Sequence, residues 1–375
     1  TPPSIPDRVK LNEKEATFFI QDIYEGEGLK GIPRGTVKSL RLHAYEYAYV
    51  KTRSDHNWHG IQSGWDIKRM LGTVPVEEDG SVIFKAPANT PISIQPLDKD
   101  GVAIQWMRSW VTGQPGEVVS CIGCHEDQNQ IAIPKRVIAS QKAPSALTLP
   151  EGGTRSFTFD LEVQPILDRA CIACHNGEGK AFDLRGGKKD KLGYGTSYLN
   201  LHPYVHRQGG EGDMVVLQPY EYHPNTSELV RLLKKGHHNV KLTDKEWKTL
   251  YNWIDYNAPD KGYFNANVLT DLPYKGFDQI KRRKELTDKY ANGAGVDWKK
   301  EIADYADYLK KQGPITPVMP EKAAPVKEKT LKVKGWPFGA DRIKEMLAKE
   351  KETRKVVEIA PGVKVNFVRI PAGEF

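Results

Sequence analysis

The sequence predicts an α+β multidomain protein, with an antiparallel β-sandwich-like domain first and a mostly α-helical domain second. Short runs of alternating apolar residues, broken by turn dipeptides, fill the first ~115 residues and indicate β structure. Helical spacing of apolar residues begins near residue 160 and returns between 227 and 255. A chain of 375 residues exceeds one ordinary core and agrees with two or three domains.

The β domain is expected over residues 1–125. Val82–Lys85 follows Asp79-Gly80, and Val102–Gln105 follows Asp100-Gly101. Asp-Gly between such runs is a strong signal for a β-hairpin. Prolines at 75, 87, 91 and 96 limit these strands to edges or short lengths. A small antiparallel sandwich is the simplest arrangement that buries one face of each strand.

Residues 126–155 lack periodicity and are rich in proline and glycine, which predicts a linker. The helical domain is expected over residues 156–265. Apolar residues at 161, 163, 166, 167 and 170 form one helical stripe. A second helix is expected over 227–235, ending at Gly236. Thr243 and Glu246 form a capping box that opens a third helix, which runs to residue 255 and stops before Pro259.

The remaining chain is predicted to be a charged, proline-rich connector over 266–355. Residues 310–332 carry four prolines among lysines and are expected to be extended or disordered. A helix is expected near 341–352. Residues 356–375 are strand-like and are predicted to begin a further domain.

All four cysteines belong to two copies of one short motif. The copies read Cys121-Ile-Gly-Cys124-His125 and Cys171-Ile-Ala-Cys174-His175. This C-x-x-C-H spacing is typical of c-type haem attachment, because two thiols three positions apart add to the two vinyl groups of one haem. The histidine that follows then binds the iron. The sequence therefore predicts two covalently bound haem c groups: haem 1 in the β domain and haem 2 in a cytochrome c-like helical domain.

Three other interpretations of the cysteine pairs are open. A zinc ribbon uses two C-x-x-C pairs, but its pairs are usually about 15–20 residues apart. Here 46 residues separate Cys124 from Cys171, and a histidine follows each pair. A thioredoxin-like redox pair does not call for that repeated histidine. A disulfide is the third alternative.

Each iron also has a second axial position. For haem 2 the predicted ligand is His237, with His238 and then His223 as alternatives, because 237 and 238 lie in a loop between two predicted helices. For haem 1 the candidates are Met107, His59 and His56, and an open position is an equal alternative. His202 and His206 have i, i+4 spacing, but Pro203 between them argues against a metal-binding pair on one helix.

Composition limits the other function classes. The net charge is +7 with 39% hydrophobic residues, which is typical of a globular protein. No apolar run reaches the ~18 residues of a membrane helix. The sequence has no basic stripe interleaved with aromatic residues, the pattern that would indicate nucleic-acid binding. Because haem attachment to this motif normally happens outside the cytoplasm, a periplasmic or other extracytoplasmic location is expected, with a targeting sequence cleaved or lying upstream of Thr1.

Two functions fit these features. The first is an electron carrier that passes electrons between a donor and a redox partner protein or fused domain, with an oligomer as a further expectation. The second is an enzyme in which an open haem 1 acts on a small nitrogen or oxygen species while haem 2 relays electrons.

Several motifs, in order, resemble the hydrazine synthase alpha subunit middle-domain family and its multidomain di-haem relatives. They lie at 19–26, 34–41, 65–81, 107–110, 120–126, 200–205, 221–224 and 235–242. The resemblance covers about residues 17–265 and implies haem ligation by the Gly236-His237 segment. In the namesake the reactive haem has a tyrosine ligand four residues after the motif histidine. Asn129 occupies that position here, which argues against hydrazine synthesis.

Residues 362–375 are similar to the opening strand of a formylglycine-generating, sulfatase-modifying-factor domain. Only about twenty residues of that fold are present. The resemblance therefore locates no catalytic residue of that family in this chain.

Overall fold

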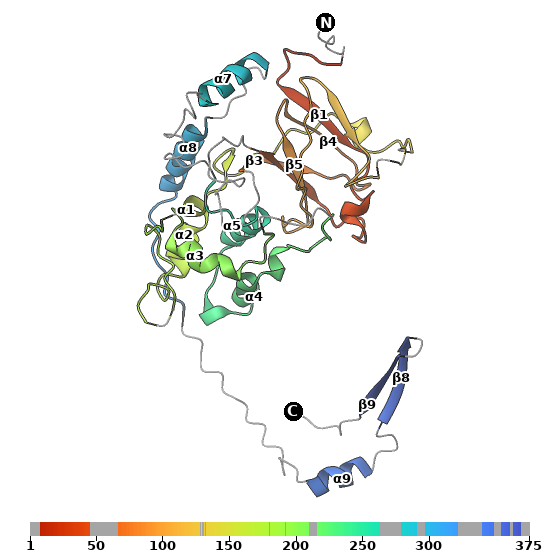
Figure 1. The fold of residues 1–375 in the computed structure, drawn as a ribbon, viewed down its shortest axis with the longest axis vertical. Coiled ribbons are helices and arrows are strands. Elements are labelled where there is room, and N and C mark those ends of the chain that lie inside the picture. The colour runs from red at the N-terminus through yellow and green to blue at the C-terminus, as the bar shows by residue number, and fades with distance from the viewer. Residues whose placement is uncertain are drawn as a thin grey trace. The chain divides into compact units, whose positions relative to one another are not determined.

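The computed structural model describes residues 8–45, 67–127, 129, 131, 133–179, 181–191, 193–209, 216–262, 279–290, 297–321, 340–348, 354–360 and 363–368 (Figure 1). The chain divides into two compact units, Thr1–Lys322 and Ala323–Phe375. The first unit contains both cysteine motifs, one in a β half and one in a helical half.

The β half consists of two sheets with a shared core. One sheet has the strand order β4 (Val82–Pro87), β1 (Glu15–Ile20), β6 (Val118–Cys121). The other has the order β5 (Ile92–Leu97), β2 (Ser39–Tyr45), β3 (Lys68–Pro75), β7 (Arg155–Ser156). Phe18 and Phe84 stack with ring centres 5.3 Å apart, and Leu40 and Leu42 are fully buried. The predicted α+β class with antiparallel sheets is confirmed.

One strand pair departs from the expected antiparallel pattern. β6 pairs with β1 in parallel, with Cys121 opposite Ile20. Both strands therefore end at the same edge of the sheet, and the first cysteine motif leaves the sheet at that edge.

The two Asp-Gly dipeptides have different roles. Asp100-Gly101 makes a short hairpin, because the Asp98 and Val102 backbones bond at 2.9 Å and Leu97 bridges Ala103 in antiparallel fashion. Asp79-Gly80 makes a tight turn, with the Gly80 N–H donating to the Glu77 carbonyl at 2.9 Å. That turn joins β3 to β4, which belong to different sheets, so the expected hairpin of neighbouring strands is not formed there.

Residues 133–155, expected within the 126–155 linker, pack on the β half. Thr148 forms a two-way backbone bridge with Thr73, and the Ser145 N–H donates to the Ile83 carbonyl at 2.9 Å. A short 3-10 helix, η2 (Ala139–Gln141), sits beside β4, and β7 ends the segment as an edge strand. Isolated β-bridges do not require alternating apolar residues. The packing of this proline-rich segment was therefore not predictable from its sequence pattern.

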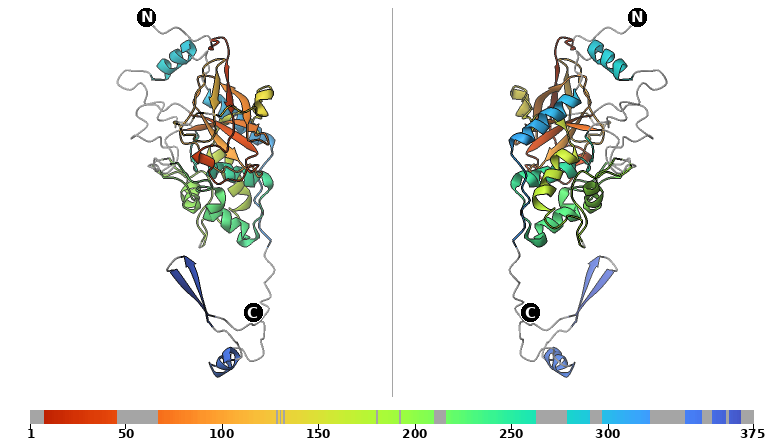
Figure 2. Two further views of the ribbon diagram at one scale, coloured as in Figure 1. Left: turned by 90° about the vertical axis from the view of Figure 1, so that its right-hand side faces the viewer. Right: turned by 90° about the vertical axis from the view of Figure 1, so that its left-hand side faces the viewer.

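The described residues of the helical half form five α-helices: α1 (Phe159–Glu162), α2 (Gln164–Ala170), α3 (Thr196–Leu201), α4 (Glu228–Lys234) and α5 (Asp244–Asp255) (Figure 2). Short 3-10 helices accompany them, η3 (His202–Tyr204), η4 (Pro224–Thr226) and η5 (His237–Asn239), while η1 (Glu27–Leu29) belongs to the β half. Trp253 is fully buried against the rings of Phe159 and Tyr198.

The helix-end signals are confirmed in this half. The Thr243 hydroxyl accepts from the Glu246 N–H, and the Glu246 carboxylate accepts from the Thr243 N–H, which makes the capping box of α5 complete. Gly236 follows α4 with φ 95°, a conformation that glycine adopts without a Cβ clash. The expected single helix over 161–170 is instead two, because the chain turns at Val163 just before Pro165.

A buried ion pair joins the β half to the helical half. Arg41 on β2 donates from Nη1 to Asp255 Oδ2 on α5 at 2.9 Å and from Nη2 to Asn252 Oδ1 at 2.7 Å. Gln95 on β5 adds a bond from Nε2 to the Asp255 carbonyl at 2.7 Å. The side chains of Arg41 and Asp255 are 8% and 0% exposed, so the pair is shielded from water.

A helix inside the expected connector also packs on this unit. α7 (Gln279–Tyr290) and α8 (Trp298–Lys311) both lie in the 266–355 segment. On α8, Glu301 pairs with Arg69 of β3 at 2.5 Å, and the Tyr305 hydroxyl donates to Glu162 at 2.7 Å. The Arg155 guanidinium lies 3.6 Å from the centre of the Tyr305 ring. These partners are far apart in sequence, which explains why composition alone indicated a connector.

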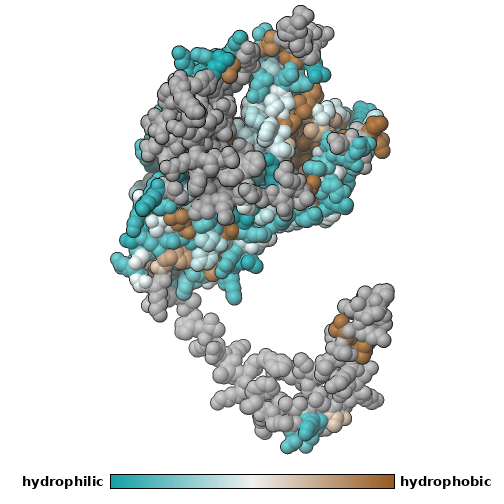
Figure 3. Space-filling view, viewed as in Figure 1, coloured by the Kyte–Doolittle hydropathy of each residue, from teal (hydrophilic) through white to brown (hydrophobic). Residues whose placement is uncertain are grey.

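The second unit contains α9 (Ala340–Ala348) and an antiparallel hairpin of β8 (Arg354–Ala360) and β9 (Val363–Val368). Both the helix and the strand character agree with the sequence prediction. In the described part of the chain, no helix is both long and apolar enough to cross a membrane. On the face drawn in Figure 3, apolar side chains form separate patches between hydrophilic ones.

We predict that Arg41→Met lowers the free energy of unfolding by about 3–5 kcal/mol, because the Asp255 carboxylate is left buried without its counter-charge. Urea denaturation measures the change. Lys99→Met is the control, since Lys99 pairs with Asp100 at the surface, and no measurable loss is expected there. A loss for Arg41→Met as small as that of the control would contradict the role of the pair.

A second prediction concerns Asp260, which follows α5. Burial raises the pKa of Asp260 to about 7, against partial opposition from Lys261. The folded protein therefore holds more protons than the unfolded chain between about pH 4 and pH 7, and stability falls as pH rises through that window. Asp260→Asn should stabilise the protein by about 2–4 kcal/mol at pH 8 and by less at pH 5. Urea unfolding at both pH values tests this.

The control is Asp304→Asn, which changes an exposed carboxylate paired with Lys300 on α8. Its effect should be the same at the two pH values. An equal effect of Asp260→Asn at pH 5 and pH 8 would argue against a raised pKa at that residue.

Candidate functional site

The first cysteine motif is held against residues 21–28 by backbone hydrogen bonds. The Gln21 N–H donates to the Cys121 carbonyl at 3.0 Å and the Asp22 N–H to the Ile122 carbonyl at 2.9 Å. The Gly28 N–H donates to the Cys124 carbonyl, also at 3.0 Å. The parallel β1–β6 pairing thus continues into the motif and fixes its backbone.

Glycine is needed where these two segments meet. A Cβ on Gly123 would lie 2.3 Å from the Glu25 carbonyl oxygen, and a Cβ on Gly28 would lie 2.5 Å from the Cys124 sulfur. Such distances are too short for any real Cβ contact. The variable positions of this motif are therefore restricted by the loop that packs against it.

The two thiols of this motif pack at the edge of the β core. Burial, with a smaller contribution from Glu126, raises the pKa of Cys121, and it raises the pKa of Cys124 to about 12. A redox-active pair needs a thiol with a lowered pKa, so these thiols do not resemble a thioredoxin-like site. His125 is exposed and has φ 59°, and the Glu126 carboxylate holds the loop by accepting from the Gly123 N–H at 3.0 Å.

The second motif continues from the C-terminus of α2. The Cys171 N–H donates to the Leu167 carbonyl at 2.8 Å, and the His175 N–H donates to the Cys171 carbonyl at 2.9 Å. One helical turn therefore leads directly into the motif and sets the directions of both cysteines and the histidine. Burial raises the pKa of Cys171 to about 12, although nearby Arg169 opposes the shift.

The His175 ring is oriented by the chain that follows it. Its Nδ1 lies 3.1 Å from the Phe182 carbonyl oxygen, and the Phe182 ring lies 4.7 Å from its centre. With the proton on Nδ1, the ring donates to that carbonyl and keeps the Nε2 lone pair for a metal. A backbone acceptor on the second ring nitrogen is the usual arrangement for a metal-binding histidine.

His237 lies opposite His175, with ring centres 6.0 Å apart and planes at 36°. A metal held between two imidazoles at about 2 Å from each nitrogen separates the ring centres by about 6 Å. The residues present therefore fit an iron with two histidine ligands. The neighbouring His238 has φ 44°, and its ring lies edge-on to that of His237 with the ring centres 4.6 Å apart. The ring contact with His175 is made by His237.

Three further contacts hold the segments that carry these two histidines. Arg169, just before the motif, forms an ion pair with Glu246 of the α5 capping box. The chain after α8 passes both sides, because the Val318 N–H donates to the Arg169 carbonyl at 2.7 Å and the Asn239 amide donates to the Glu321 carbonyl at 3.3 Å.

The structure places the other candidate ligands away from these histidines. His223 is buried between the halves, where its Nδ1 accepts from the Asn225 N–H at 3.2 Å and its Nε2 faces Asp98 at 3.9 Å. The Met107 carbonyl accepts from Ser93 beside β5, whereas the first motif lies on the other sheet. His59 and His56 fall outside the described residues.

His202 and His206 do not form a pair. The His202 Nδ1 lies 3.1 Å from the Leu199 carbonyl oxygen, while the His206 Nδ1 lies 2.8 Å from the Thr226 hydroxyl. Across the ranges that the structure describes, no group of three or more His, Cys, Asp or Glu residues is arranged to hold a metal ion. No disulfide joins the four cysteines, and their two pairs lie in different halves of the unit.

The sequence did not single out Phe182, Glu126 or Gly28 as site residues. Phe182 and Glu126 act through a backbone carbonyl and a carboxylate cap, and Gly28 acts through the absence of a side chain. None of these roles requires a recognisable spacing. Phe182 lies in the loop that follows the second motif, and this position was the one sequence signal that could have identified it.

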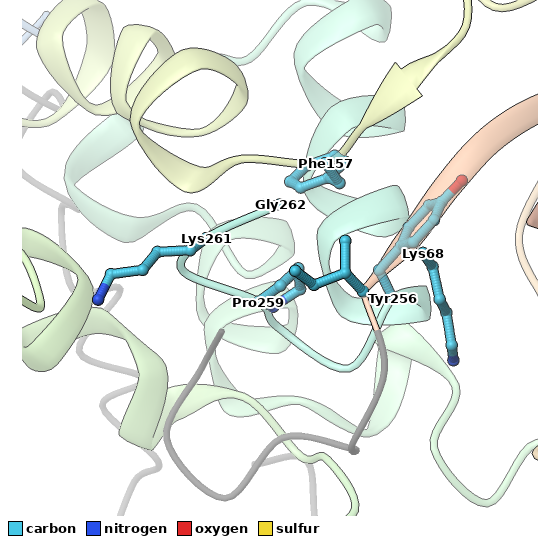
Figure 4. Close-up of a pocket in the computed structure, with 7 residues that line it drawn as sticks. Lys68, Phe157, Tyr256, Pro259, Lys261 and Gly262 are labelled. Atoms are coloured by element: carbon cyan, nitrogen blue, oxygen red, sulfur yellow. The ribbon is translucent and has the colours of Figure 1, made fainter. Parts of the chain in front are cut away.

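Among the described residues, two small hollows lie between the halves. One is lined by Ile67, Lys68, Phe157, Tyr256, Pro259, Lys261 and Gly262, and Figure 4 shows the Lys68 and Lys261 side chains extending in different directions from it. The other is lined by residues 103–106, 217, 218 and 221–223. Each has room for about one water molecule.

Comparison with known proteins supports the hydrazine synthase resemblance. Residues 35–126 match the family described as hydrazine synthase alpha subunit middle domain. Among solved structures, a chain of Kuenenia stuttgartiensis hydrazine synthase matches with a TM-score of 0.50 and 17% identity. The match covers 67% of this chain and 44% of that chain, so this chain spans less than half of that protein's length. Such low identity shows similarity of fold alone.

No curated protein sequence matches the chain. Residues 35–126, which include the first cysteine motif, are thus similar to the hydrazine synthase alpha subunit middle domain. The similarity of residues 362–375 to a sulfatase-modifying-factor domain stays a prediction.

We predict that Gly123→Ala prevents haem attachment at the first motif, because the new Cβ collides with the Glu25 carbonyl. The expected product carries one haem, at the second motif, and intact mass spectrometry counts the groups. Gly209→Ala is the control, since a Cβ at Gly209 meets nothing within 4 Å, and it should carry both. Two haems on Gly123→Ala would contradict the steric argument.

Proposed function

We propose that this chain is a di-haem c-type electron-transfer module. Each C-x-x-C-H motif binds one haem through two thioethers, and the motif histidine is an axial ligand. The observation that carries the proposal is the 6.0 Å separation of the His175 and His237 rings. When bound, each haem supplies reversible one-electron chemistry.

For haem 2, the residues of the chain have separable tasks. Cys171 and Cys174 anchor the group, His175 is held by the Phe182 carbonyl, and His237 approaches from the α4–α5 loop. Two neutral imidazole ligands leave no position for a small molecule. This arrangement favours electron transfer over substrate chemistry at haem 2.

For haem 1, the sheet edge and the 21–28 loop hold the motif rigidly. A fixed motif keeps the distance between the two haems constant, which electron transfer requires. We further propose an extracytoplasmic location, because of the attachment chemistry, and a redox partner protein or a fused domain as the electron donor or acceptor.

A haem enzyme is the second candidate, and one specific observation favours it. The family match at residues 35–126 includes the haem 1 motif and not the haem 2 motif. In that case haem 1 has an open axial position at which a small nitrogen or oxygen species reacts, and haem 2 relays electrons. The Asn129 side chain donates a hydrogen bond to Asp127 at 3.0 Å. An asparagine stands here in place of the tyrosine that the resemblance associates with hydrazine synthesis.

We predict that His237→Ala opens haem 2 to carbon monoxide. Titration of the reduced protein should show one more carbon monoxide bound per chain than in the unchanged protein, because a ligand on one side of the iron is lost. His238→Ala is the matched control and should not change the count.

An unchanged count in His237→Ala, or an increase in His238→Ala instead, would overturn the assignment of His237. The same titration separates the two functions. An unchanged protein that binds no carbon monoxide supports the electron carrier, and one that binds it at haem 1 supports the enzyme.

A further inference from the structure

The chain that leaves α8 reaches both segments that carry the haem 2 histidines. Its Val318 N–H donates to the Arg169 carbonyl at 2.7 Å, two residues before the second motif. The Asn239 amide, two residues after the opposing histidine, donates to the Glu321 carbonyl at 3.3 Å. We call residues 312–321 the tether, because they bond to the segments on both sides of the proposed iron.

The sequence of the tether favours a stiff, extended chain. Prolines stand at 314, 317 and 320, which is every third position. This spacing suits the polyproline II conformation, which has three residues per turn. The structure assigns no helix or strand over 313–321, and the segment runs along the helical half as an extended chain (Figure 2).

α8 fixes the near end of the tether. Glu301 pairs with Arg69 of β3, and the Tyr305 hydroxyl donates to Glu162 of α1 at 2.7 Å. The helix is therefore bound to the β half and to the helical half. A stiff tether that starts from it holds its own hydrogen bonds at a defined place.

The far end of the tether is weakly packed. Ile315, Val318 and Met319 are 48%, 49% and 67% exposed. An element with few buried apolar contacts opens at a lower free-energy cost than a core element does. The hold of the tether on the haem 2 segments therefore depends on its hydrogen bonds, and it can be released without unfolding the core.

The loop that carries His237 needs such a hold. Gly236, His238 and Asn239 have φ of 95°, 44° and 62°. A left-handed backbone costs free energy in a residue with a Cβ, and it persists where the surroundings fix it. The Val240 N–H bond to the His237 carbonyl at 2.9 Å shapes this turn, but it does not connect the loop to the motif.

Arg169 is the residue where the motif, the loop and the tether meet. Its carbonyl accepts from Val318, its Nη2 donates to the Lys241 carbonyl at 3.0 Å, and its guanidinium pairs with Glu246. The tether thus bonds to the loop at Asn239 and to the residue that holds the loop against the motif.

We propose that the tether keeps His237 on the iron of haem 2, an inference that rests on the proposed function. With the tether bound, both histidine segments are held and two imidazoles close the site. With the tether released, the left-handed loop relaxes, His237 leaves, and a small ligand takes its place. Val318, through its N–H, and Asn239 are positioning residues for this axial ligand.

The test is the rate of cyanide binding by ferric haem 2 in the full, haem-loaded chain, measured by stopped-flow absorbance. Cyanide binds after an axial ligand leaves. Below saturation, the rate therefore follows the fraction of molecules in which His237 is off the iron. His237→Ala should bind cyanide fastest, and the kinetic phase that accelerates in this variant identifies haem 2.

Val318→Pro removes the N–H that donates to Arg169. Because one hydrogen bond changes an equilibrium constant by about two- to tenfold, cyanide binding at haem 2 should become about two- to tenfold faster. Asn239→Asp removes the amide donor and keeps a residue type that tolerates positive φ, and it should accelerate binding by a similar factor. Amide hydrogen exchange over residues 236–241 should also become faster in both variants.

Two controls keep the bonds of the tether. Val318→Ala retains the N–H and shortens a half-exposed side chain. Ile315→Pro adds a proline at a tether position whose N–H bonds to no backbone carbonyl among the described residues. Both should bind cyanide at the rate of the unchanged protein. A Val318→Pro rate equal to theirs overturns the proposal.

The double variant, Val318→Pro with Asn239→Asp, shows whether the two bonds act as one tether. If they do, release at either end frees the loop, and the double variant binds cyanide no faster than the faster single variant. Accelerations that multiply indicate two independent contacts and overturn the proposal.

Intact mass and the His237→Ala variant separate this inference from the proposed function. A chain without haem at the second motif, or a His237→Ala rate equal to that of the unchanged protein, contradicts the proposed function itself. A haem-loaded chain in which His237→Ala is fast and Val318→Pro matches Val318→Ala overturns the tether alone.

Discussion

Arg41 and Asp255 bring opposite charges together where water does not reach, and this pair fixes the β half against the helical half. The Arg41 guanidinium also donates to Asn252 and to the Gly101 carbonyl at 2.8 Å, so its fork is used in several directions. Gln95 donates to the Asp255 backbone, and the Asp255 carboxylate accepts from the Ala103 N–H at 3.1 Å. Partners at 41, 95, 103 and 255 can meet only when both halves are folded and docked.

Docking of the two halves fixes the position of one cysteine motif relative to the other. The first motif leaves the edge of a sheet, and the second leaves the end of a helix, so each is rigid within its own half. The ion pair is a buried, charged contact that helps to hold the distance between them. α8 strengthens the arrangement, because Glu301 bonds β3 while Tyr305 packs on Arg155 and Glu162. Electron transfer between two fixed centres depends on this rigidity.

Local chemistry in the sequence predicted much of the helical half. The capping box at Thr243 and Glu246, the glycine after α4 and the C-x-x-C-H motif after α2 each require only neighbours within one turn. His237 was predicted as a ligand for a similar reason, since it lies in a loop between two helices, and its ring lies 6.0 Å from that of His175. These elements are encoded by short spacings that any reader of the sequence can find.

Long-range pairing was not predictable in the same way. The parallel β1–β6 pair joins residues about a hundred positions apart, and nothing in either strand specifies its direction. Residues 133–155 use isolated bridges instead of an alternating pattern, so their packing resembled a linker. α8 is charged on its surface and makes its decisive contacts through Glu301 and Tyr305. Gly28 and Gly123 act by leaving space, which a single sequence does not reveal.

The central claim is that both cysteine pairs carry thioether-bonded haem. The most direct measurement is the intact mass of the protein after denaturation, compared with a Cys171→Ala, Cys174→Ala variant. The account predicts the polypeptide plus two haem groups for the unchanged chain and plus one for the variant. A polypeptide mass without added haem, or metal analysis that returns zinc and no iron, would contradict it.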